Sequence, residues 1–195
     1  MTATNSIAIF GGTFDPIHNG HIHLLQGILK SNEFSKVVVV PAGNPWQKSP
    51  TAPALDRLEM VQLALKDSGV DVSDCEVRRS GSSYAIDTVE ALAEIYPNSN
   101  FTWIIGSDAL ASLSTWHHIE QLASRIDFLI VMRPGHSIDE SSTPHYIQGK
   151  TIEIQALDIS ATKVRELIST GGDISSLVPA SVASYIRTKG LYGAA

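Results

Sequence analysis

Short apolar runs alternate along the chain with longer stretches in which apolar residues recur every three or four positions. The short runs are typical of buried strands, and they lie at 7–10, 37–40, 70–77, 101–105, 128–132 and 151–154. The periodic stretches predict helices at 21–29, 55–65, 86–95, 107–123, 160–168 and 182–187. This alternation predicts an α/β fold, with a doubly wound, mostly parallel sheet of five or six strands.

Loops that directly follow the predicted strands hold most of the unusual residues. The richest three are 11–21, 42–48 and 106–108. In doubly wound sheets ligands bind at the carboxyl ends of the strands, so these loops should converge on one site. The helix at 107–123 is expected to break near Ser114, and the polar segment 133–150 is predicted to be a surface loop.

Composition is that of an ordinary globular protein. The 195 residues are 43% hydrophobic and 17% charged, which fits a single domain over 1–195 with the C-terminal helical part, about 160–190, packed on it. The net charge is −6 and the pI is near 5.6, so no basic excess exists to attract nucleic acid.

Neither disulfides nor membrane spans are expected. Cys75 is the only cysteine, which excludes an intramolecular disulfide and a cysteine-based zinc site. The longest apolar runs are a few residues, far short of the roughly 20 that span a bilayer. No membrane partner is therefore predicted, and a cytoplasmic location is expected.

The segment Gly11–His21 reads Gly-Gly-Thr-Phe-Asp-Pro-Ile-His-Asn-Gly-His, between the first strand and the first helix. It contains neither the dinucleotide fingerprint nor a Walker A loop. Glycines at such a turn allow close approach, and the helix N-terminus favours an anion. We therefore predict that a nucleotide phosphate chain binds beside His18 and His21. The alternatives are a plain glycine turn with capping histidines, or a metal on His18, His21 and His23, which lack an acidic or cysteine partner at ligand spacing.

A second cluster lies near the C-terminus, where the sequence reads Ile-Ser-Ala-Thr-Lys-Val-Arg over 159–165. Ser160 is placed to cap the helix, with Thr162 in its first turn and Arg165 close to the same face. A hydroxyl, free N–H groups and a guanidinium at one helix start form a phosphate site. The alternative is a routine N-cap followed by a solvated arginine.

These motifs, taken together and in order, resemble those of the nucleotidylyltransferase superfamily. Further motifs lie between the two clusters: Ser-Tyr-Ala-Ile-Asp-Thr at 83–88, Ile-Gly-Ser-Asp at 105–108 with Trp116 eight residues on, and Arg-Pro-Gly at 133–135. They look like those of the bacterial nicotinate-nucleotide adenylyltransferase family. The resemblance extends from Ile7 to Tyr192 and implies a Rossmann-like nucleotidylyltransferase fold.

The resemblance also implies roles for individual residues. ATP phosphates would be held by Gly11, Gly12, Thr13, Phe14, His18, His21 and Lys48, and the far end of the triphosphate by Ser160, Thr162 and Arg165. Gly106 and Asp108 would bind the adenosine part. The nicotinate ring and its carboxylate would meet Tyr84, Ala85, Trp116 and His117, with Trp116 stacked on the ring and Arg133 close by. Many family members carry Asn at position 42, Pro-His at 46–47 and Thr at 85, where this chain has Ala42, Trp46-Gln47 and Ala85.

The implied reaction transfers AMP from ATP to nicotinic acid mononucleotide, giving nicotinic acid adenine dinucleotide and pyrophosphate for NAD biosynthesis. A phosphate monoester has its second pKa near 6, so the nucleophile is mostly ionised at neutral pH and needs no general base. His18, His21, Lys48 and Arg165 are the predicted catalytic residues, which stabilise developing charge. Mg²⁺ would arrive bound to ATP, with no protein metal ligands.

Two alternatives stay open at this point. A sister enzyme would adenylylate another small phosphate such as phosphopantetheine, although Tyr84 and Trp116 suit a flat ring. A non-catalytic nucleotide-binding module would use the same fold, although His18, His21 and Arg165 are intact. A homo-oligomer is compatible with the sequence.

Overall fold

One parallel sheet forms the centre of the computed structural model, which describes residues 5–132, 147, 149–155 and 157–194 without the side chains of Asp108 and Ala111. The strands are β1 (Ser6–Gly12), β2 (Lys36–Pro41), β3 (Asp71–Val72), β4 (Asn100–Gly106), β5 (Asp127–Met132) and β6 (Gly149–Glu153). Their order is β3-β2-β1-β4-β5-β6, and all neighbours are parallel. The predicted doubly wound fold is confirmed.

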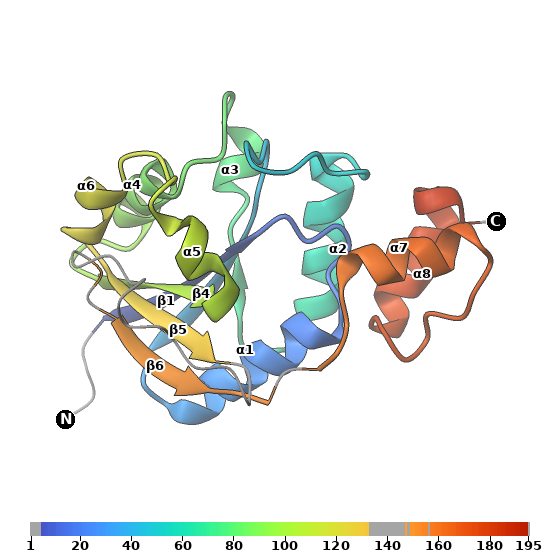
Figure 1. The fold of residues 1–195 in the computed structure, drawn as a ribbon, viewed down its shortest axis with the longest axis horizontal. Coiled ribbons are helices and arrows are strands. Elements are labelled where there is room, and N and C mark those ends of the chain that lie inside the picture. The colour runs from blue at the N-terminus through green and yellow to red at the C-terminus, as the bar shows by residue number, and fades with distance from the viewer. Residues whose placement is uncertain (1–4, 133–146, 148, 156, 195) are drawn as a thin grey trace.

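Helices cover both faces of this sheet (Figure 1). They are α1 (Asn19–Ser31), α2 (Ala54–Leu65), α3 (Cys75–Arg78), α4 (Ala85–Ile95), α5 (Leu110–Leu113), α6 (Ile119–Ala123), α7 (Ala161–Ser169) and α8 (Ala180–Lys189), with short 3₁₀ turns η1 (Ser107–Ala109) and η3 (Leu191–Gly193). No helix within the described residues is long and apolar enough to span a bilayer.

Alternate residues of the strands belong to two separate cores. Ala8 of β1 lies in the core beneath α1, α2, α7 and α8, whereas its neighbour Ile9 lies in the core beneath α4, α5 and α6. Both residues are fully buried, which explains why the strands read as continuous apolar runs. The C-terminal helices extend the first core, because α8 packs on α2. Figure 1 shows them at the end of the molecule that carries the C-terminus.

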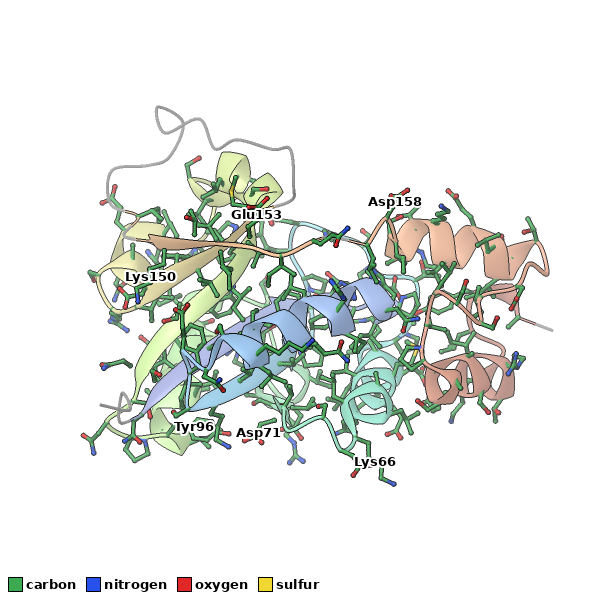
Figure 2. All side chains as sticks on the ribbon, turned by 90° about the horizontal axis from the view of Figure 1, so that it is seen from below. Lys66, Asp71, Tyr96, Lys150, Glu153 and Asp158 are labelled. Carbon is green, nitrogen blue, oxygen red and sulfur yellow. The ribbon has the colours of Figure 1, made fainter. Side chains whose placement is uncertain are left out.

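The sheet edge at β6 carries exposed charged residues. Figure 2 labels Lys150 and Glu153 on this strand and Asp158 in the segment that leads to α7. Charged side chains on an edge strand oppose pairing with another chain. The strand predicted at 151–154 is present, but it begins at Gly149. The predicted loop 133–150 therefore ends two residues too late. Most of that loop lies outside the described residues.

The expected strand at 70–77 is wrong for most of its length. Only Asp71 and Val72 pair with β2, and α3 starts at Cys75. The Ser73 N–H donates to the Val39 carbonyl (2.9 Å), while the Ser73 hydroxyl accepts from the Cys75 N–H (3.4 Å) and starts a helical turn. The break predicted near Ser114 is confirmed, since α5, which follows η1 directly, ends at Leu113 and α6 begins five residues after Ser114.

Candidate active site

Two adjoining cavities lie at the carboxyl ends of β1 and β4. The first has a volume of about 710 Å³ and the second about 450 Å³. Both are lined by Phe10, Gly11, Gly12, Thr13, Lys48 and Gly106. β1 and β4 are the strands at which the order of the sheet reverses, the position where doubly wound sheets bind ligands.

Gly11 is required by the packing at this strand end. A Cβ atom there would lie 2.5 Å from Cζ2 of Trp103, which is buried on the adjacent strand β4. Any side chain would displace the indole or the strand. The close approach expected of this glycine is therefore made by Trp103, and the strand end stays flat where the two cavities meet.

Two stacked histidines stand on the wall of the first cavity. The rings of His18 and His21 are 3.7 Å apart between centroids, and His18 is the N-cap of α1. The His18 backbone N–H donates to Nδ1 of His21 (3.2 Å), which leaves the His21 proton on Nε2. Phe14 packs edge-on against His21 at 5.1 Å. Nδ1 of His18 is buried and lacks a partner among the described residues.

Both histidines are neutral at physiological pH. Burial lowers the pKa of His18 from its ordinary 6.5 to about 4. Burial also lowers the pKa of His21 well below 6.5, and the charges of His18 and Lys48 push it the same way. The rings therefore serve as neutral N–H donors, and the formal positive charge beside the first cavity comes from Lys48 and Arg165.

The first turn of α7 forms another part of the wall of the first cavity. The Ser160 hydroxyl accepts from the Lys163 N–H (3.2 Å), so this residue caps α7 as the sequence predicts. Arg165 donates from Nη1 to the Asp15 carbonyl (2.7 Å) and from Nη2 to the Thr162 hydroxyl (3.3 Å). The first bond joins α7 to the 11–21 segment across 150 residues of sequence. Both bonds hold the guanidinium at the cavity wall.

Aromatic rings surround the second cavity. Tyr84 stacks on His117 with 4.1 Å between ring centroids, and Trp116 meets Trp103 edge-on at 5.9 Å. Trp46 lies 6.3 Å from the Tyr84 ring and is 45% exposed. Flat apolar walls of this kind bind flat aromatic ligands.

The second cavity also contains the start of α4. Ala85 is the first residue of this helix, and a backbone N–H at that position has no partner within the helix. The unpaired N–H groups and the helix dipole favour a carboxylate there. Glu76, which is buried beside them, accepts a hydrogen bond from the Thr88 hydroxyl, and burial raises the pKa of its carboxyl group.

The sequence-predicted site residues divide between the two cavities. The first is lined by Gly11, Gly12, Thr13, Phe14, His18, His21, Lys48, Gly106, Ser160, Thr162 and Arg165. The second shares five of these and adds Tyr84, Ala85, Trp116 and His117. Arg133 and the side chain of Asp108 lie outside the described part of the chain. The placement fits the predicted roles, which stay predictions.

Sequence reasoning gave no role to several residues that build this region. Arg57 is fully buried although it is charged, whereas Leu55, the apolar residue at which the predicted helix 55–65 begins, is 72% exposed. The Asp15 carboxylate accepts from the Thr51 N–H (2.7 Å) and from the hydroxyl of Tyr192 (2.8 Å) near the C-terminus. An arginine four residues before Val61, on the helix face that is otherwise apolar, was the available signal for Arg57.

Comparison with known proteins identifies relatives that span almost the whole chain. The cytidylyltransferase-like family model matches residues 9–167. Proteins named probable nicotinate-nucleotide adenylyltransferase are 36% identical in Neisseria meningitidis serogroup C and 38% identical in Synechococcus sp.. Each alignment includes 95% of this chain, with 98% and 96% of the respective relatives.

Solved structures give the same result. The Plasmodium falciparum nicotinic acid mononucleotide adenylyltransferase complexed with NaAD matches with a TM-score of 0.82 at 26% identity. The same protein complexed with APC matches with a TM-score of 0.79, also at 26% identity. Both comparisons include 97% of this chain and 98% of the solved one.

Proposed function

Because this chain belongs to the cytidylyltransferase-like family, among its nicotinate-nucleotide adenylyltransferase members, we infer that it transfers AMP from ATP to nicotinic acid mononucleotide. The products are nicotinic acid adenine dinucleotide and pyrophosphate, a step of NAD biosynthesis. The protein is thus a nucleotidyltransferase, and its two substrates are nucleotides.

One observation supports this function most strongly: the two cavities share a wall. That wall consists of the end of β1 at Gly11–Thr13, Gly106 at the end of β4, and Lys48. A transfer between two bound molecules needs their reacting atoms within contact distance. We therefore place the α-phosphorus of ATP and the phosphate of the mononucleotide at this shared wall, on either side of Lys48.

The first cavity suits ATP. His21 offers an Nε2–H, α7 offers a capped N-terminus, and Arg165 and Lys48 supply positive charge. Donors of these kinds can bind a triphosphate from the starts of two helices, α1 and α7. The apolar residues Leu24, Val131 and Ile154 line the same cavity and can accept the adenosine part.

The second cavity suits the mononucleotide. Tyr84, His117 and Trp116 give flat surfaces for the pyridine ring. The first N–H of α4, at Ala85, is a donor that suits a carboxylate ligand. A carboxylate that accepts backbone N–H groups is bound more strongly than a neutral amide. The contact runs through the main chain, so Ala85 serves as well as the threonine of many family members.

The chemistry requires alignment and charge stabilisation. The mononucleotide phosphate is ionised at neutral pH and attacks the α-phosphorus directly, while the P–O bond to the pyrophosphate group breaks. The His21 N–H, the Lys48 ammonium and the Arg165 guanidinium stabilise the charge that develops on the phosphorus oxygens and on the leaving group. His21 has no free lone pair to act as a nucleophile, because Nδ1 accepts a bond and Nε2 carries the proton.

Mg²⁺ belongs to this proposal as a partner of ATP. Among the described residues, no group of three or more His, Cys, Asp or Glu is placed to hold a metal. The ion would be coordinated by phosphate oxygens and water, and it would neutralise charge on the triphosphate. Removal of Mg²⁺ by EDTA should abolish transfer, and added Mg²⁺ should restore it.

Location and assembly are also proposals. A cytoplasmic enzyme has direct access to ATP, and the described part of the chain holds no helix that could cross a membrane. Light scattering on the purified protein would measure whether it forms the homo-oligomer that the sequence allows.

Pyrophosphate release with three alternative acceptors tests the function. ATP is supplied with nicotinic acid mononucleotide, its amide or phosphopantetheine. We expect release with the acid form and slower release with the amide. Fastest release with phosphopantetheine would identify the sister activity, and no release with any acceptor would leave only a binding module.

A further inference from the structure

Arg57 is a buried cation that the transfer reaction does not use directly. Its side chain is fully buried within α2, in the core that also contains Met60 and Val61. Burial lowers the pKa of this guanidinium, while the charges of Asp15 and Glu76 raise it. A charge in such a place is costly unless its donors are satisfied, so its contacts indicate what it is for.

Those contacts are three main-chain carbonyls. Nε donates to the Ala52 carbonyl (3.2 Å), Nη1 to the Thr13 carbonyl (2.6 Å) and Nη2 to the Gly43 carbonyl (3.1 Å). Thr13 lines both cavities, and Gly43 follows Ala42 in the loop whose residues 45–48 line the second cavity. One planar guanidinium therefore bonds to both substrate loops at once.

Both loops also make hydrogen bonds that do not involve Arg57. The Asp15 carboxylate accepts from the Thr51 and Ala52 N–H groups (2.7 and 3.0 Å), which joins the 13–15 segment to the far end of the β2–α2 connection. Asn44, at the near end of that connection, exchanges two bonds with Ser83: its N–H donates to the hydroxyl (3.0 Å), and its carbonyl accepts from the Ser83 N–H (2.9 Å). These bonds remain when Arg57 is changed.

Near Gly43 the two loops are joined through the strand ends and through Arg57. Pairing of β1 with β2 ends where the Ala42 N–H donates to the Gly12 carbonyl (2.8 Å). Beyond that bond, Arg57 joins Thr13 to Gly43. Gly43 is pressed against α3, because a Cβ atom there would lie 2.1 Å from the Glu76 carbonyl oxygen. The loop therefore lies between the guanidinium and the α3 backbone.

We propose that Arg57 is a positioning residue, which sets the separation of the two substrate loops and so aligns the mononucleotide phosphate with the α-phosphorus of ATP. The inference rests on the proposed function. A misplacement of about 1 Å between reacting groups can cost about a hundredfold in rate. Because the bonds of Asp15 and Asn44 remain, loss of the Arg57 bridge between Thr13 and Gly43 should lower kcat and leave the binding of each substrate alone unchanged.

Arg57→Lys tests this proposal. Lysine retains a cation, but it lacks the planar fork that reaches three carbonyls in fixed directions. The control is Val61→Ala, one turn further along α2, which removes buried volume at a side chain that cannot donate a hydrogen bond to either loop. Both variants should have a lower Tm, but only Arg57→Lys should lose kcat, by roughly a hundredfold. Calorimetry should give wild-type Kd values for ATP and the mononucleotide, each titrated alone.

Several outcomes would overturn the proposal. They are an unchanged kcat in Arg57→Lys, a loss confined to the binding of one substrate, or an equal loss of kcat in Val61→Ala. If Arg57→Lys does not fold, Arg57→Gln replaces it, and failure of both to fold would make the arginine a purely structural residue. Absence of transfer by the wild-type protein would instead reject the proposed function.

Discussion

At the residue scale, the state of His21 follows from one backbone bond. The His18 N–H occupies Nδ1 of His21, and burial keeps the ring neutral. The ring therefore presents one Nε2–H toward the first cavity. The sequence predicts that these histidines stabilise charge, and their lowered pKa values mean that they would do so as neutral donors.

Replacing His21 by alanine removes that donor. We expect kcat to fall about a hundredfold or more, as for loss of one donor to a developing oxyanion. His21→Asn retains a side-chain N–H and should recover part of the loss. Steady-state rates of pyrophosphate release measure both variants, and near-normal turnover in His21→Ala would remove this residue from the chemistry.

Stability should depend on pH through the same pair. The pKa of His18 is about 4 in the folded protein against an ordinary 6.5, so the unfolded chain binds the extra proton first as the pH falls. The contribution of neutral His18 to the free energy of unfolding is fully present above pH 6.5 and is lost as the pH falls toward 4. The loss amounts to roughly 3 kcal/mol, and buried His21 acts in the same direction.

Urea unfolding of the wild type and His18→Asn at a series of pH values measures this effect. The free energy of unfolding should fall less steeply in the variant as the pH decreases through this window. Parallel curves for the two proteins would show that burial of His18 has no such consequence.

Arg57 shows where residue patterns mislead. The apolar spacing correctly predicts α2, yet it places exposed Leu55 on the buried face and gives no role to Arg57. The partners of this arginine are carbonyls at positions 13, 43 and 52. Main-chain carbonyls carry no residue-type signal, so their convergence depends on the tertiary fold.

At the element scale, helix starts contribute to the walls of both cavities. α7 begins with a capped turn at the first cavity, and α4 begins at the second. The cap at Ser160 was predictable because its chemistry is local. The short β3 was not, since only two residues pair at a sheet edge and the serine that ends the pairing resembles any polar strand residue.

Removal of the α7 cap should affect stability and ATP binding together. Ser160→Ala should lower the free energy of unfolding by about 1 kcal/mol and raise KM for ATP, with KM for the mononucleotide unchanged. Ser160→Asp keeps the cap but adds a negative charge, so it should restore stability and weaken ATP binding further. Urea unfolding and steady-state kinetics test the pair, and tighter ATP binding by Ser160→Asp would contradict a phosphate site here.

The start of α4 permits a test of one backbone N–H group, that of Ala85. Proline is tolerated at the first helical position, and Tyr84, with φ −104° and ψ 134°, has the extended backbone that precedes proline. Ala85→Pro therefore removes one N–H and leaves the helix intact. KM for the mononucleotide should rise about tenfold or more, with KM for ATP unchanged.

Ala85→Ser is the matched control, because it keeps the N–H and adds a small side chain. Its kinetics should remain close to those of the wild type. Wild-type KM for the mononucleotide in Ala85→Pro would show that this N–H does not contact the substrate.

At the scale of the whole molecule, the sheet order places two cavities on either side of one strand end. β1 lies between β2 and β4, so loops after all three strands reach the same point. Alternation of strands and helices is enough to predict the fold class. It does not reveal that the C-terminal segment contacts the loop after β1, where the Tyr192 hydroxyl donates to Asp15 across 177 residues.

In the proposed reaction the two substrates react directly across the wall shared by the cavities, with no adenylylated enzyme between them. A single in-line displacement inverts the configuration at the α-phosphorus. We predict that ATP with a chiral α-thiophosphate, incubated with nicotinic acid mononucleotide and Mg²⁺, yields dinucleotide of inverted configuration. Retention of configuration, which requires two successive displacements, would contradict direct transfer between the two substrates.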